Sequence, residues 1–268
     1  PCVEEPLTPV YVPAGQSRVI RLPRPKSAAA ADRIVLRGDD AEFDNVHYVV
    51  APRYEQIRAA YLGADSADDP QGLRYYLERA LADAPLRKVD LRATRAEAPL
   101  PLAGDERPKL VVVAEAAPPS VAEQLASYVR SGGTLLAVLA NRQMGESLAP
   151  LFAGVEFGEQ GADSGEYQLL GEIDFTHPLF SPFANPRYSD FTKIHFWKHR
   201  PVTVAADAES KVVARFDDQH PAIVEHPLGA GRALLLTSGW QPADSQLALS
   251  TKFVPLIHEL LDLACGSR

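Results

Sequence analysis

The residues of this chain that could do chemistry are few, and most follow a stretch expected to be a strand. Ligands of open α/β sheets bind beyond the carboxyl ends of the strands, so polar residues at those ends are the first candidates. They define a candidate ligand crevice made of Asp65, Asn141, Arg142, Ser238 and Trp240. A hydrolase at this place would need a Ser or Cys on a sharp turn with a His base in reach.

None of these strand ends carries a recognisable nucleophile. The apolar stretch "TLLAVLA" runs into Ala140 and Asn141, with no Ser, Cys or Thr. Ser238 in "LLLTSGW" lacks a G-x-S-x-G context and is interpreted as a turn serine. Asn141 and Arg142 are residue types that favour the start of a helix. The sequence therefore predicts no catalytic residue.

The seven histidines and the acidic runs match no complete metal pattern. His195 and His199 in "KIHFWKHRP" are four residues apart, and their aromatic neighbours predict a strand with both on one face. Without an HExxH pattern or a paired carboxylate the set is incomplete. His220, His226 and His258 are interpreted as surface or boundary histidines, and the runs "GDDAEFD" and "GADSADD" lack the calcium-loop spacing. The sequence predicts neither a metal nor a cofactor.

An aromatic, proline-rich stretch at residues 174–199 is the densest unusual feature. In one interpretation it is a docking surface for a partner, or a stacking platform for sugar rings or bases. The candidate partner surface then consists of Phe180, Phe183, Tyr188, Phe191 and Phe196. In the other interpretation, which the length of the stretch favours, it is a long loop that covers the sheet edge with a small core of its own.

Charge and composition narrow the class of partner. The chain has 268 residues and a formal net charge of −8, which argues against a phosphate backbone and hence against nucleic acid. No apolar run is long enough to span a bilayer. The two cysteines, Cys2 and Cys265, form no CxxC motif, and the question of a disulfide between them stays open.

The elements that would position these residues change character near residue 52. Residues 1–51 contain short β-type runs separated by Pro, Gly and Asp, as expected for the last strands of an immunoglobulin-like sandwich. Residues 52–268 alternate strand and helix patterns, which predicts an α/β domain with an open parallel sheet and helices on both faces. We expect Asp69 and Pro70 to begin the first helix, and Pro119 and Ser120 the second.

Strands are expected at "IRAAYLG", "RKVDLRA", "KLVVVAEA" and "TLLAVLA". The third is apolar on both faces, which indicates a central strand. After Gly154 the pattern becomes antiparallel, with a hairpin turn at Gly229-Ala230-Gly231, and a final helix begins at about Thr251.

An ordered set of motifs resembles the C-terminal region of BatA-type bacterial membrane proteins. The motifs include "GDDAEFDNVHYVV", "SYVRSGGTLLAVL", "IDFTHPLFSPFANPRYSDF" and "FVPLIHELL". The resemblance covers essentially the whole chain. It implies a flavodoxin-like, class I glutamine amidotransferase-like domain after the immunoglobulin-like strands. It also implies a full-length protein anchored by a double-transmembrane segment, with this part on the periplasmic side.

The resemblance also shows a departure from the amidotransferase pattern. That pattern places a Cys at the tip of "TLLAVLA" and a His-x-Glu near "LLLTSGWQPAD", where this chain has Ala140-Asn141 and Gly239-Trp240-Gln241. We therefore expect a non-catalytic interaction or scaffold domain with protein partners at the cell envelope. The alternatives are a module that binds a sugar or peptidoglycan fragment in the former crevice, or an unrecognised hydrolase.

Overall fold

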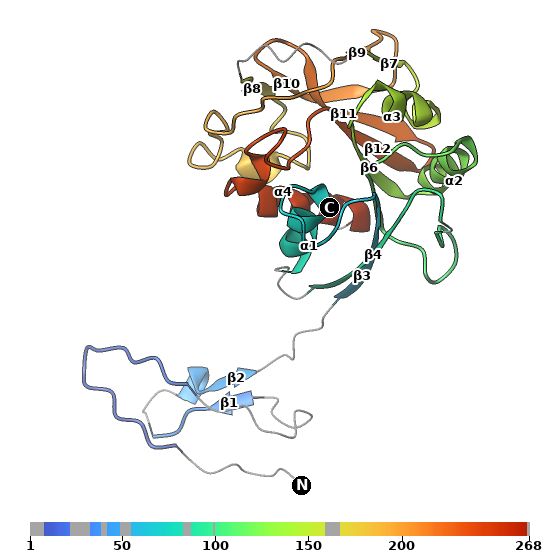
Figure 1. Ribbon diagram of the computed structural model, residues 1–268. Coiled ribbons are helices and arrows are strands. Elements are labelled where there is room, and N and C mark those ends of the chain that lie inside the picture. The colour runs from blue at the N-terminus through green and yellow to red at the C-terminus, as the bar shows by residue number, and fades with distance from the viewer. Residues whose placement is uncertain are drawn as a thin grey trace. The chain divides into compact units, whose positions relative to one another are not determined.

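The chain forms two compact units, Pro1–Arg53 and Tyr54–Arg268. The computed structural model describes residues 8–21, 33–38, 42–48, 55–82, 87–98, 100–158 and 167–266 (Figure 1). The boundary between the units follows Arg53, two residues after the boundary expected at residue 51. The disulfide left open between Cys2 and Cys265 involves a residue, Cys2, that lies outside the described part of the chain.

The described part of unit 1 contains one antiparallel strand pair. Strand β1 (Arg33–Val35) pairs with β2 (Val46–Tyr48) after a single 3₁₀ turn (Glu42–Asp44). Large apolar side chains of this unit are exposed, among them Tyr11, Val19, Leu36, Phe43 and Tyr48. The immunoglobulin-like assignment stays a prediction.

Unit 2 is built on one eight-stranded sheet, and the predicted open α/β fold is confirmed. Five strands at one end are mutually parallel and three at the other are antiparallel. The central position expected for the third strand is correct, since all four of its residues are buried. The spatial order is β4 (Arg87–Thr94), β3 (Glu55–Leu62), β5 (Leu110–Val113), β6 (Thr134–Val138), β12 (Gly231–Leu236), β11 (Pro221–Leu228), β10 (Lys211–Phe216) and β8 (Leu170–Ile173).

Strand β12 has a role that the sequence pattern did not reveal. It forms the expected hairpin with β11 across Gly229-Ala230-Gly231, but its other edge pairs in parallel with β6. The last strand in the described part of the chain is therefore a central strand that joins the parallel and antiparallel parts. Gly231 allows this, because a Cβ there would lie 2.1 Å from the carbonyl oxygen of Val129.

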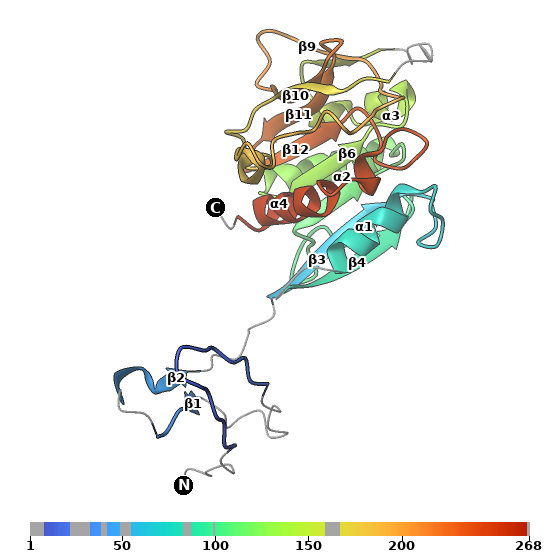
Figure 2. The same cartoon turned by 90° about the vertical axis from the view of Figure 1, so that its left-hand side faces the viewer.

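The helices cover both faces of the sheet (Figure 2). On one face, α1 (Leu73–Ala82) contacts α4 (Phe253–Cys265), which begins two residues later than expected. On the other face, α2 (Pro119–Arg130) and α3 (Arg142–Ser147) pack through a second apolar cluster. Short 3₁₀ turns (Ala149–Leu151, Ser181–Phe183, Leu247–Leu249) and the pair β7 (Val155–Phe157) and β9 (Val202–Val204) complete the unit. No helix in the described ranges combines the length and the apolar character needed to cross a membrane.

One of the two predicted helix starts is correct and the other is wrong. Helix α2 begins at Pro119 as expected. Helix α1 begins at Leu73 instead of near Pro70, because Asp69 makes a local turn, accepting the N–H of Gln71. Asp65 supplies the missing acceptor, since its Oδ2 receives the N–H of Arg74 at 2.7 Å.

The aromatic stretch is a core rather than a surface. Phe180, Phe183, Phe191 and Phe196 are all buried, and the first three contact one another edge-on or tilted. They belong to the same apolar cluster as α1 and α4. The interpretation as a loop that anchors itself through buried aromatic side chains is thus correct, but these side chains join the main core instead of forming a small core of their own. The partner surface expected from these four side chains is wrong because they face inward.

A buried histidine ties this stretch to the sheet. His177 accepts the N–H of Leu179 through Nδ1, so its Nε2 carries the proton and donates to Glu225 of β11 at 2.8 Å. Arg232 of β12 binds the other carboxylate oxygen of Glu225 at 2.9 Å. The hydrogen bond from His177 is the main cause that lowers the pKa of Glu225.

We predict that Phe180→Ala lowers the free energy of unfolding by about 3–5 kcal/mol, because it leaves a cavity in the core. Tyr188, which is 51% exposed, provides a matched control, and Tyr188→Ala should change stability by no more than about 0.5 kcal/mol. Urea denaturation followed by circular dichroism measures both. Equal effects of the two variants would contradict the inward packing of the segment.

We predict that Glu225→Gln weakens the loss of stability at acid pH. A carboxyl group with a lowered folded pKa stabilises the protein above its unfolded pKa of about 4.3, and this contribution disappears as the pH falls through the folded value. The stability difference between neutral pH and about pH 3.5 should therefore be smaller in the variant. Glu172→Gln is the control, because Glu172 is 64% exposed in its ion pair with Arg215. If Glu225→Gln loses as much stability between neutral and acid pH as the wild type, the lowered pKa of Glu225 is refuted as a source of this pH dependence.

Candidate functional site

The carboxyl ends of β6 and β12 lie next to each other and define the place where a nucleophile and its base would meet. The two strands are paired in parallel up to Val138 and Leu236, and the N–H of Leu139 donates to the Leu236 carbonyl oxygen. Beyond them the chain reaches Ala140 on one side and Ser238 on the other. This is the edge at which open α/β sheets bind ligands.

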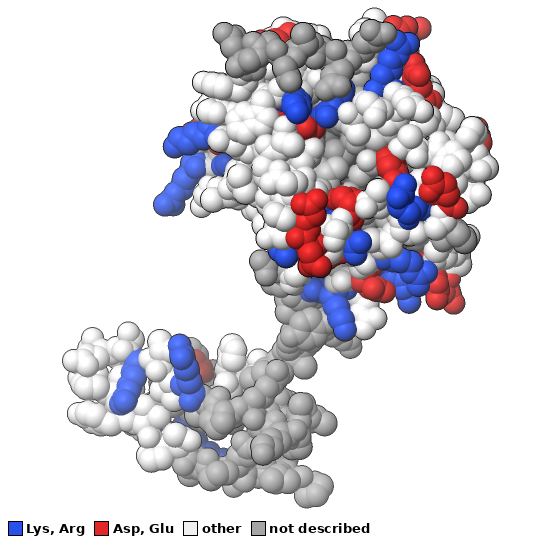
Figure 3. Space-filling model, viewed as in Figure 1, with Lys and Arg blue, Asp and Glu red and all other residues white. Residues whose placement is uncertain are grey.

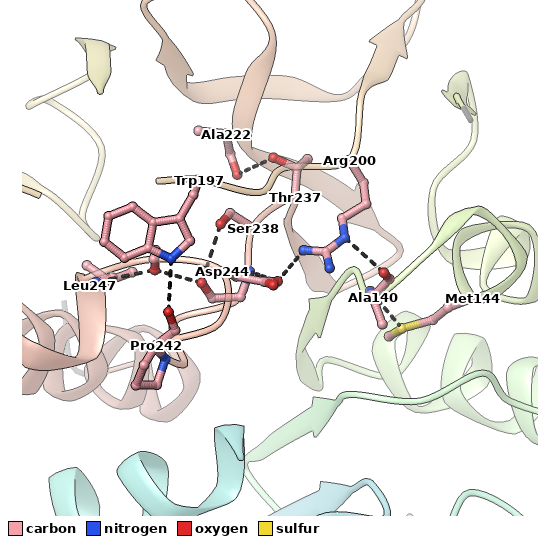
Figure 4. A network of polar contacts seen from close by, with 12 residues as sticks. Ala140, Met144, Trp197, Arg200, Ala222, Thr237, Ser238, Pro242, Asp244 and Leu247 are labelled. Atoms are coloured by element: carbon pink, nitrogen blue, oxygen red, sulfur yellow. Dashed lines mark hydrogen bonds and ion pairs between the residues drawn. The ribbon is translucent and has the colours of Figure 1, made fainter. Parts of the chain in front are cut away.

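A buried ion pair holds this junction (Figure 4). The Arg200 Nη1 atom contacts the Asp244 Oδ2 atom, and both side chains are less than one-tenth exposed. The Arg200 Nε atom donates to the carbonyl oxygen of Ala140 at 2.8 Å, and the same Asp244 oxygen accepts the N–H of Gly239 at 3.2 Å. One guanidinium and one carboxylate thus join the tip of β6 to the tip of β12.

Backbone hydrogen bonds place the two charged residues. The N–H of Arg200 donates to the Thr237 carbonyl oxygen at 2.8 Å, which fixes the residue against the end of β12. The carbonyl oxygen of Asp244 accepts the N–H groups of Trp197 and Lys198. The loop that follows β12 and the loop that ends at Arg200 therefore hold each other in place.

The five residues of the predicted crevice do not line a common opening. Asn141 caps α3, its Oδ1 accepting the Met144 N–H at 2.9 Å, and Arg142 pairs with Glu146 on the same helix. Both are exposed, and their expected role at a helix start is confirmed.

The other crevice residues are engaged inside the fold. Ser238 is buried and its hydroxyl donates to the Gly239 carbonyl oxygen. Trp240 is fully buried and donates from Nε1 to the Leu73 carbonyl oxygen at 2.8 Å. Asp65 accepts the Tyr61 hydroxyl at 2.6 Å as well as the first turn of α1. Trp240 and Asp65 thus both hydrogen-bond to the first turn of α1, where their role is structural.

The cavity beside Trp240 cannot hold a sugar. Its volume is about 20 Å³, whereas ligand pockets measure roughly 300–1,000 Å³ and contain converging polar groups. Every lining residue is apolar or aromatic: Leu136, Leu179, Ile223, Leu234, Leu236, Trp240, Leu247, Phe253, Leu256, Ile257 and Leu260.

A serine–histidine contact exists, but at the opposite edge of the sheet. Ser210 Oγ lies 2.9 Å from His226 Nδ1, where β10 begins and β11 approaches its end. Because β11 is antiparallel to β12, this is the amino edge of the parallel strands. His226 is buried, which lowers its pKa. The pair lies away from the carboxyl edge at which an unrecognised hydrolase was expected to show one.

Exposed aromatic side chains do occur at the carboxyl edge, at positions that the sequence analysis did not select. Tyr167 is 51% and Trp197 is 38% exposed. Tyr167 stacks on His195 at 3.8 Å, and Trp197 meets the same imidazole edge-on. Tyr188 is the one member of the predicted partner surface that is exposed. The aromatic patch is defined here as Tyr167, His195 and Trp197, whose rings are joined through His195.

Three potential metal ligands meet at this same edge. His199 Nε2 and His220 Nδ1 each lie 3.2 Å from Asp218 Oδ2, and the three ligand atoms are all within 4.8 Å of one another. Asp218 and His220 belong to the turn between β10 and β11, which lies beside the end of β12. Burial lowers the pKa of His199, which favours the neutral imidazole that metals require.

This group was not predicted from the sequence, for two reasons. His199 was expected on a strand with His195, but residues 191–200 form irregular chain with only an isolated bridge at Phe196, so the strand is wrong. His220 was expected to be a surface or boundary residue. The spacing Asp218-x-His220 across a tight turn was a usable signal, but His199 reaches it only through the tertiary fold.

Solved structures that are similar to this chain share its fold at low sequence identity. A cytoplasmic protein, STM3548 from Salmonella typhimurium, matches with a TM-score of 0.56 at 14% identity over 78% of this chain and 98% of its own. A ThuA-like protein from Bacteroides uniformis matches with a TM-score of 0.54 at 10% identity over 85% of this chain and 95% of its own. These similarities show a flavodoxin-like, amidotransferase-like α/β domain.

A third solved structure places the same fold inside a larger enzyme chain. The β-galactosidase from Rahnella sp. R3 matches with a TM-score of 0.53 at 14% identity, over 80% of this chain but 32% of its own. No protein-family model and no curated protein matches the sequence.

We predict that Arg200→Met lowers the free energy of unfolding by about 3–5 kcal/mol, because it leaves the Asp244 carboxylate buried without its counter-charge. The double variant Arg200→Met/Asp244→Leu should recover part of this loss, since neither charge remains. Thermal and urea denaturation measure all variants.

The control is Arg92→Gln, which breaks an ion pair with Glu106 in which both side chains are more than half exposed. It should cost no more than about 1 kcal/mol. An Arg200→Met variant as stable as Arg92→Gln would show that the pair does not hold the junction.

Proposed function

We propose that this chain is a non-catalytic, extracytoplasmic interaction domain of a membrane-anchored bacterial envelope protein. The observation that carries the proposal is the Arg200–Asp244 pair. The pair spans the junction at which an amidotransferase of this fold would bring a nucleophile and a histidine together. Its atoms hydrogen-bond to both strand tips, to the Ala140 carbonyl oxygen and the Gly239 N–H, so these two backbone groups are already engaged within the fold.

The chemistry of the described residues supports the absence of a hydrolase at this edge. Ser238 donates its hydroxyl to a neighbouring carbonyl oxygen. A serine nucleophile instead needs a base that accepts this proton. At the carboxyl edge, His195 stacks on Tyr167 and His199 contacts Asp218.

The surface supports a protein partner. The aromatic patch presents Tyr167 and Trp197 to solvent, and large aromatic side chains with a polar end are enriched at protein interfaces. Acidic and basic side chains are interspersed on the visible face of unit 2 (Figure 3). Together with the net charge of −8, this favours a protein over a phosphate backbone.

The location is proposed from the sequence resemblance to BatA-type proteins. In such a protein the α/β domain is carried outside the cytoplasm by a double-transmembrane segment. The exposed apolar side chains of β1 and β2, such as Ile34 and Tyr48, suit strands that another part of a sandwich would cover.

We predict that a photo-crosslinking amino acid at Trp197, introduced into the protein in its native membrane, captures a specific envelope protein. The same group at Arg92, which is exposed at the far edge strand β4, is the control. Mass spectrometry of the cross-linked species identifies the partner, and protease protection of intact cells and spheroplasts reports the side of the membrane.

A second measurement addresses catalysis. We expect a fluorophosphonate probe, which labels activated serines, to leave Ser238 and Ser210 unmodified in the purified protein. Labelling of either serine that depends on His226 or another histidine would replace the proposal by a hydrolase. Equal cross-linking from Trp197 and Arg92 would remove the aromatic patch as the partner site.

A further inference from the structure

We propose that His199, Asp218 and His220 form a binding site for a divalent transition-metal ion of the Zn²⁺ type at the carboxyl edge of the sheet. Two imidazoles and a carboxylate are the donor set that such ions prefer. Ligand atoms about 2.0–2.1 Å from a tetrahedral zinc lie about 3.3 Å from one another. Both imidazole nitrogens lie 3.2 Å from Asp218 Oδ2.

The turn that carries two of the ligands is held in one shape. Asp218 Oδ1 accepts the N–H of His220 at 3.0 Å, which leaves Oδ2 directed toward the two imidazoles. Gln219 between them has a φ of +70°, and it is the one described residue other than glycine in the left-handed region. Arg215 fixes this turn by donating to the Gln219 carbonyl oxygen at 3.0 Å. Outer contacts of this kind orient the ligands of metal sites.

The third ligand is positioned independently of the turn. His199 precedes Arg200, whose backbone and guanidinium are fixed to Thr237 and Ala140. The His199 ring also packs on Phe216 at a centroid distance of 4.7 Å. Two separately anchored segments therefore bring the donors together before any ion binds, which lowers the ordering cost of binding.

Three protein ligands leave a coordination position for water or for an anionic oxygen of a ligand. Asp218 and His220 are exposed, so this position faces solvent. The proposal does not depend on the partner proposed above, because a metal site at this edge is compatible with a protein partner or with none.

The test is calorimetric titration of chelator-treated protein with Zn²⁺. We expect one ion per chain, and a loss of affinity of at least about 10–100-fold in both Asp218→Asn and His220→Asn, since even outer-shell losses have effects of this size. Both residues are exposed, and asparagine at 218 keeps the acceptor for the His220 N–H, so each variant should fold. Unchanged melting temperatures without metal check this.

Two controls separate the site from adventitious binding. His47→Asn removes an exposed histidine of unit 1 and should leave the affinity unchanged. Cys265→Ser removes a thiol that could bind zinc by itself, and it should also have no effect. With Co²⁺ as the probe, we expect a visible spectrum of nitrogen and oxygen ligation without a thiolate charge-transfer band.

The opposite results would overturn the proposal. They are zinc affinity that is the same in wild type, Asp218→Asn and His220→Asn, or affinity that disappears only in Cys265→Ser. Loss of cross-linking from Trp197 with zinc binding intact would reject the partner site alone, so the two proposals fail separately.

Discussion

The fold around the carboxyl edge depends on the requirement that a buried charge must have a partner. Arg200 and Asp244 come from two irregular segments, which contact each other through this ion pair and through backbone hydrogen bonds. Burying one charged group alone costs several kcal/mol even after relaxation, so each side chain fixes the position of its counterpart. Because the guanidinium also binds Ala140 and the carboxylate binds Gly239, this constraint extends to both strand tips. The edge is thereby set by electrostatics more than by regular secondary structure.

The same constraint shapes the carboxyl edge between β6 and β12. The space between the tips of β6 and β12 is bridged by polar side chains, and the layer beneath it is filled by Trp240 and the apolar residues around it. Accessible polar groups lie beside this junction. Among them are the aromatic patch and the group formed by His199, Asp218 and His220.

The sequence predicted the architecture well where the signal was local. The apolar run of β5, the Pro119 start of α2 and the glycine turn before β12 each depend on a few neighbouring residues, and each is correct. The start of α1 was wrong because its cap, Asp65, lies nine residues before Arg74 and satisfies the helix through a tertiary contact. The parallel pairing of β12 with β6 could not be read from periodicity, since a central strand of either direction shows the same apolar run.

The site was less predictable for the same physical reason. Asn141 and Arg142 were correctly assigned to a helix start, because capping is a local preference. The Arg200–Asp244 pair joins residues 44 positions apart, and no spacing rule marks such a pair. The four phenylalanines could have faced either solvent or core, and only the packing against α1 and α4 decides between these possibilities.

The central position of β12 has a consequence for the order in which the protein can assemble. While the ribosome has not yet released residues 231–236, β6 is an edge strand with unpaired backbone groups, and β11 lacks the neighbour that links it to the parallel strands. Such an edge is a template for pairing with another chain. The nascent domain therefore has an open, apolar sheet edge at β6 from the time that strand emerges until residues 231–236 emerge and pair with it.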